Sequence, residues 1–422
     1  MVAPRLSAEA NRRLADNSQE VPGQFSGVQR RAVHILHVIG SLSPADGGPP
    51  EAVRQFAKIY AQIGDTVEVL CQDEPDSPWL KDFPCPAHAL GQRWLGRFGF
   101  SPRLWRWLHQ NAGRFDGIVM QGIWIFPNLA VRSAARKAGV EYGVFVHGAL
   151  DPWFNKRYPL KHLKKLLYWP LQYPVLRDAL GVFFTCDAER DLAATSFRPN
   201  RWKSVVVPYV IGEPEGNPTL QTQTFYERFP ALRGRRFLLF LSRIQQKKGC
   251  DLLIQAFAHV ASSNPDLDLV MAGPDQVGWQ QTLEQMAADL GIAHRVYWPG
   301  MLSGDLKWGA FREADAFILP SHQENFGIAV VESLAVGRPV LISNQINIWQ
   351  DVEREGVGLV DDDSLEGTLR LLSRWLSLPR PERDAMADRC QPAFVSRFSS
   401  RGSADFLNRR FLLAELLDSK VA

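Results

Sequence analysis

The sequence predicts an α/β protein built from two doubly wound domains, each with a parallel sheet at its centre. Its length of 422 residues fits two domains of ordinary size. Hydrophobic residues make up 45% of the chain and charged residues 22%, which is typical of a globular protein and unlike a disordered one. Short apolar strands alternate with amphipathic helices, and this alternation starts afresh in the second half.

The first half opens with an apolar run over 33–39, which indicates a buried strand. A Gly- and Pro-rich loop over 41–50 leads into apolar residues spaced by three and four over 52–63, the stripe of an amphipathic helix. Gly64 ends this helix and a strand follows at 66–71, which completes a β-α-β unit. Further strands of this half are expected at 117–120, 143–146, 181–185 and 204–207.

The second half repeats the pattern. Strands are expected at 236–241, 267–272, 296–298, 316–319 and 340–343, and helices at 251–260, 280–290 and 327–336. Between the two runs, 211–224 is poor in apolar residues, so we predict a first domain at 32–215 and a second at 216–400. The polar, aperiodic residues 1–31 are expected to form a flexible arm.

Composition also excludes several classes of protein. No apolar run reaches the roughly 18 residues of a spanning helix. The first 30 residues carry arginines but no apolar stretch, which argues against a signal peptide and for a cytoplasmic chain. The cysteines are few and lack Cys-x-x-Cys spacing, so reduced thiols are expected rather than a zinc or disulfide framework. These cysteines are Cys71, Cys85, Cys186, Cys250 and Cys390.

Charge is distributed unevenly between the halves. Residues 1–215 hold 26 Lys and Arg against 20 Asp and Glu, whereas 216–422 hold 22 against 25. This asymmetry suggests domains that face different partners. The net charge of +3 is only mildly basic, which makes nucleic acid an unlikely partner.

The most informative segment for function is 320–332. A strand ends, a loop carries Glu324, and a helix begins near Phe326 and Gly327, where free N–H groups suit an anion or sugar oxygens. Glu332 lies eight residues after Glu324 among apolar residues, and a carboxylate placed there needs a partner. Two carboxylates at this spacing suit hydrogen bonds to two hydroxyl-bearing parts of one long ligand.

A second group of candidates follows the strand at 236–241. Arg243 and Lys248 lie in the turn beyond its carboxyl end, where ligands of open parallel sheets bind. An arginine forks onto phosphate oxygens and a lysine adds a compact charge, so this pair suits a diphosphate. Taken alone, the turn would be an ordinary solvated basic loop, and the glutamate segment favours the functional interpretation.

Two weaker signals lie in the first half. His147 ends a strand and precedes a glycine, a position from which it would contact a sugar hydroxyl or a developing charge, although a structural histidine is the common alternative. Gly47 and Gly48 precede the first helix and allow a ligand close to the backbone. Their spacing does not match the Gly-x-Gly-x-x-Gly dinucleotide fingerprint.

Two acidic clusters resemble metal ligands in composition. One is Asp266 with Asp268, and the other is 361–363. The first precedes a strand and the second lies in a polar loop, so neither supplies the convergent oxygens that a hard cation needs. We therefore expect no bound metal and no resident cofactor.

Basic residues are interleaved with aromatic and leucine residues over 83–115 and 156–177. The first segment has five arginines and the second has six Lys and Arg from Lys156 to Arg177, and neither contains an acidic residue. This pattern suits an anionic membrane surface. An amphipathic helix that covers the sheet is an equally good explanation.

These residues resemble a known family. Ser242-Arg243 with Lys248-Gly249, and Glu324-x-Phe326-Gly327 with Glu332, are similar to the donor-site pattern of family 4 retaining glycosyltransferases of the GT-B fold. The resemblance covers about 32–400, and its Glu-x7-Glu segment is the most specific part. The sequence 146–153, which includes His147, is similar to members that build bacterial surface polysaccharides. The family implies two Rossmann-like domains that face across a cleft.

The resemblance also implies roles for the candidates. Arg243 and Lys248 would hold the diphosphate of a nucleotide-diphosphate sugar, which is a co-substrate. Glu324, with Phe326 and Gly327, would bind the donor sugar, and Glu332 the ribose. His147 would contact the sugar near the reacting carbon, and Gly47 and Gly48 would close over the phosphates. The first domain would bind the acceptor and the second the donor, and 401–422 would form a helix that crosses back to the first domain.

The reaction implied is metal-independent transfer of a hexose to a saccharide, expected to be lipid-linked, at the inner face of the cell membrane. One departure from the family is the loop 344–349, which lacks the usual glycines and leaves base and sugar preference open. A sugar-nucleotide epimerase of similar architecture is an alternative, and would need acid–base carboxylates facing the sugar. A non-catalytic two-domain sugar-binding protein is a second alternative.

Overall fold

The computed structural model describes residues 31–91, 93–207, 209, 211–212 and 214–398. The chain divides into the units Met1–Ala32 and Val33–Ala422, and the account below concerns the second unit. The predicted arm lies outside the described residues except for Arg31, and so does the predicted helix at 401–422.

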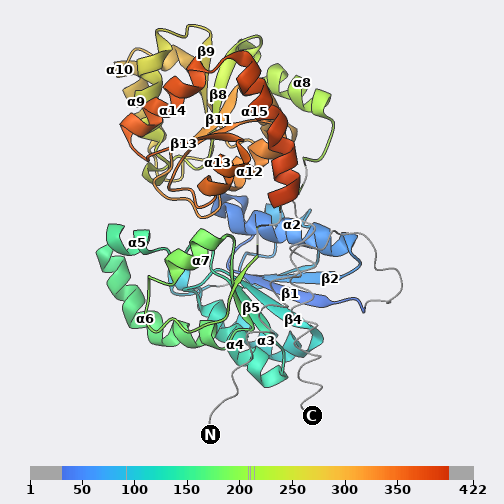
Figure 1. Ribbon diagram of the computed structural model, residues 1–422. Helices are drawn as coiled ribbons and strands as arrows, with labels where there is room; N and C mark the ends of the chain where they lie inside the picture. The colour runs from blue at the N-terminus through green and yellow to red at the C-terminus, as the bar shows by residue number, and fades with distance from the viewer. Residues whose placement is uncertain (1–30, 92, 208, 210, 213, 399–422) are drawn as a thin grey trace, which may run out of the picture. The chain divides into compact units, whose positions relative to one another are not determined.

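The first domain contains a seven-stranded parallel sheet with the order β3-β2-β1-β4-β5-β6-β7 (Figure 1). Its strands are β1 (His34–Ile39), β2 (Thr66–Cys71), β3 (Ala87–Ala89), β4 (Gly117–Gln121), β5 (Tyr142–Phe145), β6 (Gly181–Phe184) and β7 (Ser204–Val206). Its helices are α2 (Gly48–Gln62), α3 (Pro102–Asn111), α4 (Phe126–Ala138), α5 (Pro152–Arg157), α6 (Pro159–Arg177) and α7 (Asp187–Ala193).

The second domain contains a six-stranded parallel sheet with the order β10-β9-β8-β11-β12-β13. Its strands are β8 (Arg236–Leu241), β9 (Leu267–Ala272), β10 (Val296–Gly300), β11 (Ala316–Leu319), β12 (Val340–Ser343) and β13 (Gly358–Asp361). Its helices are α8 (Pro218–Arg228), α9 (Cys250–Ala261), α10 (Gln280–Asp289), α11 (Gly304–Glu313), α12 (Ile328–Ala335), α13 (Trp349–Glu355), α14 (Leu365–Ser377) and α15 (Arg380–Ala393).

Strand β1 shows how the first sheet is covered on both faces. Successive side chains of a strand point to opposite faces. Leu36 and Val38 join the core that α3, α4 and α6 complete, whereas Ile35 packs with Phe56 and Tyr60 of α2. A strand buried on both faces reads as a continuous apolar run, which is why the sequence identified it.

The prediction of two parallel-sheet α/β domains is confirmed. The expected strands and helices are present, with small shifts at their ends. Two short edge strands, β3 and β13, were not predicted. The predicted boundary at 215/216 falls in the connection between β7 and α8.

The strand orders determine where a ligand would bind. In the first sheet β1 lies between β2 and β4, and in the second β8 lies between β9 and β11, so each sheet reverses its winding at these strands. Open α/β sheets bind ligands beyond the carboxyl ends of the strands at such a switch point. The loops that follow β1, β8 and β11 are therefore the places to look for a site.

Candidate functional site

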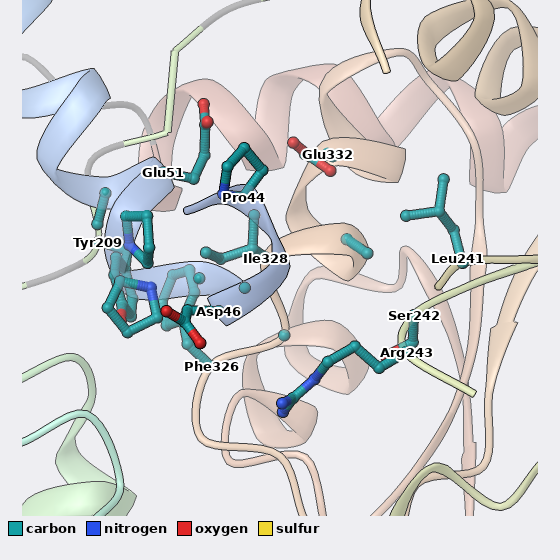
Figure 2. Close-up of a pocket in the computed structure, with 18 of the residues that line it drawn as sticks. Pro44, Asp46, Glu51, Tyr209, Leu241, Ser242, Arg243, Phe326, Ile328 and Glu332 are labelled. Atoms are coloured by element: carbon teal, nitrogen blue, oxygen red, sulfur yellow. The ribbon is translucent and has the colours of Figure 1, made fainter. Parts of the chain in front are cut away.

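One cavity of about 900 Å³ lies within the unit Val33–Ala422, a size suited to a nucleotide-sized ligand (Figure 2). Its wall includes every residue that the sequence singled out, from both domains. These are Gly47, Gly48, His147, Arg243, Lys248, Glu324, Phe326, Gly327 and Glu332.

The basic turn after β8 carries two of these residues, Arg243 and Lys248. Figure 2 shows the Arg243 side chain extending from the end of β8 into the pocket. Lys248 ends a short 3-10 turn, Gln246–Lys248, and Gly249 follows with φ +66°. A Cβ on Gly249 would lie 2.1 Å from the carbonyl oxygen of Pro320, so only glycine lets this turn lie against the end of β11.

Positive charge accumulates at this turn. Lys248 is almost fully buried and its Nζ contacts the Glu324 carboxylate. Burial, together with the neighbouring charges of Lys247 and Arg243, lowers the pKa of Lys248 well below its ordinary value. The pKa of Lys247 falls to about 8 because of burial and the Arg243 charge. A bound polyanion would relieve this crowding of cations.

The loop after β11 is held in place by backbone hydrogen bonds. The Glu324 N–H donates to the Gln345 carbonyl (3.0 Å), and the Asn347 N–H donates to the Glu324 carbonyl (3.2 Å). Phe326 is buried, and Gly327, with φ +77°, directly precedes helix α12. The loop 344–349, whose sequence departs from the family pattern, therefore supports the Glu324 backbone directly.

Glu332 on α12 has the partner that its apolar surroundings require. Lys307 of α11 donates to it at 2.7 Å, and both side chains are largely buried. Burial favours a lower pKa for Lys307, but the carboxylates of Glu332 and Glu51 outweigh burial and raise it. Glu51, from α2, lies near Glu332 in the view of Figure 2, so this end of the cavity holds two carboxylates and one lysine.

His147 belongs to a buried chain of hydrogen bonds. Its Nε2 is 2.7 Å from the Gln121 side-chain oxygen, and the Tyr209 hydroxyl contacts its Nδ1. The Gln121 amide nitrogen in turn lies 2.9 Å from Nδ1 of His37. Burial lowers the pKa of both His37 and His147 to about 3, so both rings are neutral at physiological pH.

This chain assigns a tautomer to His147. The Tyr209 hydroxyl donates to Nδ1, since burial, with a smaller effect of the Glu189 charge, raises the pKa of Tyr209 well above its ordinary value and keeps it protonated. Nε2 then carries the proton and donates to Gln121. A neutral ring whose two nitrogens are both hydrogen-bonded is poorly suited to act as a general base.

The loop after His147 is fixed by a buried carboxylate. Glu189 accepts from the N–H of Gly148 and from the N–H of Thr185, both at 2.6 Å. The Thr185 hydroxyl accepts from the Asn325 side chain at 3.0 Å. Through Glu189 and Thr185, the loop that follows His147 in the first domain is therefore linked to the loop that carries Glu324.

The glycine pair begins helix α2. Gly47 has φ +86°, a conformation that favours glycine. A Cβ on Gly48 would lie 3.0 Å from Cδ1 of Ile328, the first residue of α12. Any side chain at residue 48 would press on Ile328, so the pair permits a close approach between the two helix starts.

Aspartates of both acidic clusters form ion pairs with arginines. Asp268 pairs with Arg235 and with Arg295 (3.2 Å), and Asp361 pairs with Arg370 (2.5 Å). Within the described part of the chain there is no group of three or more His, Cys, Asp or Glu residues placed to hold a metal ion.

The two basic segments differ in structure. In 83–115, Phe98 and Phe100 pack on Phe126 with ring centroids 6.0 Å and 4.8 Å away, while Trp94 and Leu95 are exposed. In 156–177, helix α6 exposes several leucines. No helix among the described residues is long and apolar enough to cross a bilayer.

Sequence reasoning missed several residues of the cavity wall. Glu51, Lys307 and Tyr209 line it, and so does Lys247, the neighbour of the predicted Lys248. Lys307 and Glu51 lie on helices with no distinctive spacing. The apolar neighbours of Glu332 in the sequence indicated that its carboxylate needs a partner, but not where in the chain that partner lies.

Two family profiles match the chain. The one described as glycosyl transferase 4-like domain matches residues 47–209, and the one described as glycosyl transferases group 1 matches 223–391. The first profile covers β2 to β7 of the first sheet, and the second covers all six strands of the second sheet.

Curated relatives match over shorter stretches. The D-inositol 3-phosphate glycosyltransferase of Rhodococcus jostii (strain RHA1) is 30% identical over 181 residues, which are 42% of this chain and 40% of that protein. An uncharacterized glycosyltransferase of Methanocaldococcus jannaschii is 30% identical over 145 residues, 33% of this chain and 36% of that protein. The matched stretches thus span less than half the length of these relatives.

Solved structures match over nearly the whole chain. Sucrose-phosphate synthase from Thermosynechococcus elongatus has a TM-score of 0.74 at 16% identity, covering 92% of this chain and all of that one. Anabaena HepE in complex with UDP and glucose has a TM-score of 0.71 at 18% identity over the same shares. The fold is GT-B, and the chain belongs to the group 1 glycosyltransferases that carry a glycosyltransferase 4-like domain.

Proposed function

We propose that this protein transfers a hexose from a nucleotide-diphosphate sugar to a saccharide acceptor with retention of anomeric configuration. The observation that carries the proposal is the pairing, in one cavity, of a cation cluster with two carboxylates. Arg243, Lys247 and Lys248 form the cluster, and Glu324 and Glu332 are the carboxylates. The cluster matches a diphosphate, and the carboxylates match the hydroxyls on either side of it.

The chemistry needs charge neutralisation more than acid catalysis. A nucleotide diphosphate leaves readily once cations stabilise its developing charge. In the proposed mechanism Arg243 and Lys248 supply that stabilisation, Glu324 with the backbone of Phe326 and Gly327 orients the sugar, and Glu332 binds the ribose. The acceptor hydroxyl attacks on the face from which the diphosphate departs, and a departing phosphate oxygen takes its proton.

The remaining candidates position the reactants. Gly47 and Gly48 bring the start of α2 close to the phosphates, and His147 lies near the reacting carbon as a neutral ring. Because the cation cluster would neutralise the diphosphate by itself, we propose that no divalent metal is required. A chelator should then leave turnover unchanged.

The acceptor is proposed to be lipid-linked and part of cell-surface polysaccharide synthesis. Two observations support this class. One is the sequence likeness around His147, and the other is the fold likeness to WaaG, a glycosyltransferase involved in lipopolysaccharide biosynthesis, with a TM-score of 0.67 at 18% identity. Phosphorylated small acceptors are the competing class, since curated relatives are named D-inositol 3-phosphate glycosyltransferases. We further propose that the protein acts at the inner face of the membrane.

The epimerase alternative is less well supported by the geometry. Glu324 contacts Lys248 and Glu332 pairs with Lys307, so neither carboxylate is poised as a free acid or base. A sugar-binding protein without activity would explain the cavity equally well. Product analysis separates all three, because only transfer releases a nucleoside diphosphate in step with a new glycoside.

The test is turnover of UDP- and GDP-hexoses with lipid-linked and soluble saccharide acceptors. Removing one group that stabilises developing charge costs on the order of 10²–10³ in rate, so Arg243→Ala should lose at least about 100-fold. Glu324→Ala removes a group that orients the sugar, and such misplacement should also cost about 100-fold. Arg354→Ala is the matched control, since Arg354 forms an exposed pair with Asp351 and does not line the cavity. Full activity in both site variants would refute the proposed site, and an inverted product would refute retention.

A further inference from the structure

Helix α6 presents an apolar face that the fold does not bury. Leu160, Leu163, Leu167 and Leu171 are exposed by 79%, 56%, 77% and 55%. At 100° per residue these four side chains fall within an arc of about 80°. The buried side of the helix carries Trp169, Gln172 and Leu176, so the leucine stripe points away from the core.

Basic residues lie along one side of this leucine stripe. Lys161 and Lys164 are exposed, and neither forms a salt bridge with any described residue. The sequence from Pro152 to Arg177 contains no Asp or Glu. The surface is therefore apolar along its centre and positive at its margin, without compensating acids of its own.

This combination favours an anionic bilayer over other occupants. A helix with leucines on one side and lysines beside them lies in the interfacial plane, with the lysine stems reaching toward headgroups. A second copy docked through the same face would bring one basic surface against another, because a two-fold interface uses the same surface of both copies. The prolines at 170 and 174 and the flanking lysines argue against a spanning segment, and Figure 1 shows α5 and α6 at the margin of the first domain.

The helix is also connected to the cavity. Nζ of Lys165 lies 3.4 Å from the carbonyl oxygen of Ala149, two residues after His147. Phe154 of the preceding helix α5 lines the cavity and lies 4.9 Å beneath Nζ of Lys247. A membrane that held α6 would thus lie next to the chain segment that forms one wall of the site.

We propose that α6 docks flat on an anionic lipid bilayer, with Leu160, Leu163, Leu167 and Leu171 inserted among the acyl chains. Lys161 and Lys164 contact the anionic headgroups. The inference deepens the proposed function by naming the surface from which a lipid-linked acceptor is taken. Docking itself requires no donor and no turnover, so it is measured independently of the transfer reaction.

The test is sedimentation of the full chain with vesicles of phosphatidylcholine alone or with 30% phosphatidylglycerol. We expect binding to the anionic vesicles that weakens with added salt. The double variant Leu163→Gln/Leu167→Gln should lose at least tenfold in partition coefficient on anionic vesicles. Lys161→Gln/Lys164→Gln should lose the preference for anionic over neutral vesicles.

The matched control is Leu220→Gln/Leu290→Gln, which changes two exposed leucines of the second domain. It should bind as the unmodified protein does, and unchanged thermal midpoints would show that all variants fold. Failure of the unmodified protein to bind, or equal binding by the leucine variant, would overturn the proposal and leave an acidic protein partner as the occupant. Turnover of a water-soluble acceptor should be the same in all of them, so failure of docking and failure of the proposed reaction give different results.

Discussion

His37 and His147 are buried as neutral rings, held through Gln121 in one hydrogen-bonded chain. Their pKa values of about 3 lie far below the ordinary 6.5. A base whose pKa is depressed by folding binds fewer protons when folded than when unfolded at any pH between these two values. Its contribution to stability is therefore complete above pH 6.5 and declines as the pH falls toward 3.

This difference predicts how stability depends on pH. Between pH 6 and pH 4, each histidine should add a slope of up to about 1.4 kcal/mol per pH unit to the free energy of unfolding. His37→Asn keeps an acceptor for Gln121 and removes one titrating ring, so its slope should be shallower by up to that amount. Urea unfolding at several pH values measures it. His259→Asn, at an exposed helix position, is the control, and a slope of His37→Asn equal to that of the unmodified protein would contradict the prediction.

Helices α11 and α12 place a buried ion pair beside the cavity. Lys307 and Glu332 are 2.7 Å apart, with side-chain exposures of 20% and 9%. A buried pair adds little net stability when intact, but removal of one partner leaves the other charge uncompensated. The contact with Lys307 thus fixes the position of the Glu332 carboxylate in the wall of the cavity.

The ion pair between these helices can be tested by a substitution of Lys307. Lys307→Met should lower the free energy of unfolding by about 3–5 kcal/mol, because Glu332 would remain buried without its cation. Adding Glu332→Gln should recover much of that loss. Arg354→Met, which breaks an exposed pair, should change stability by less than about 0.5 kcal/mol. Denaturant unfolding provides all three values, and a cost for Lys307→Met as small as the control would show that the pair is not effectively buried.

The molecule as a whole encloses the cavity with segments from both sheets. Gln323 donates to Asp151 at 2.7 Å, and Asn325 donates to Thr185 at 3.0 Å, so the loop after β11 is joined to first-domain residues. A ligand held by this loop and by the turn after β8 stabilises only the folded chain. Its binding free energy therefore adds to the stability of the protein.

Thermal unfolding with nucleoside diphosphates tests this expectation. UDP or GDP at 100 times its dissociation constant should add about 2.7 kcal/mol to the free energy of unfolding and raise the midpoint. Uridine and guanosine, which lack the diphosphate, should have little effect, and Arg243→Ala should reduce the gain. If neither diphosphate at millimolar concentration shifted the midpoint, the cation cluster would not be a diphosphate site.

The sequence by itself determined the α/β class and most of the strands. Five of the seven residues in 33–39 are apolar, with His34 and His37 as the exceptions, because the strand is buried on both faces. This signal is present without tertiary context. Strand β3 reads Ala-His-Ala and β13 reads Gly-Leu-Val-Asp, so neither has the longer apolar run by which equally short strands such as β11 were identified. They are strands only because a neighbouring strand supplies hydrogen-bond partners.

The candidate site also contains residues that the sequence indicated and contacts that only the tertiary structure revealed. Glu324, Phe326 and Gly327 are adjacent in sequence, and the strand order that places β8 beside β11 brings Lys248 to Glu324. Only the tertiary structure paired Glu332 with Lys307 and placed Glu51 near that lysine, because contacts between separate helices leave no local pattern. The sequence therefore indicated part of the site, and the folding of the two sheets decided which further residues line it and which of them touch.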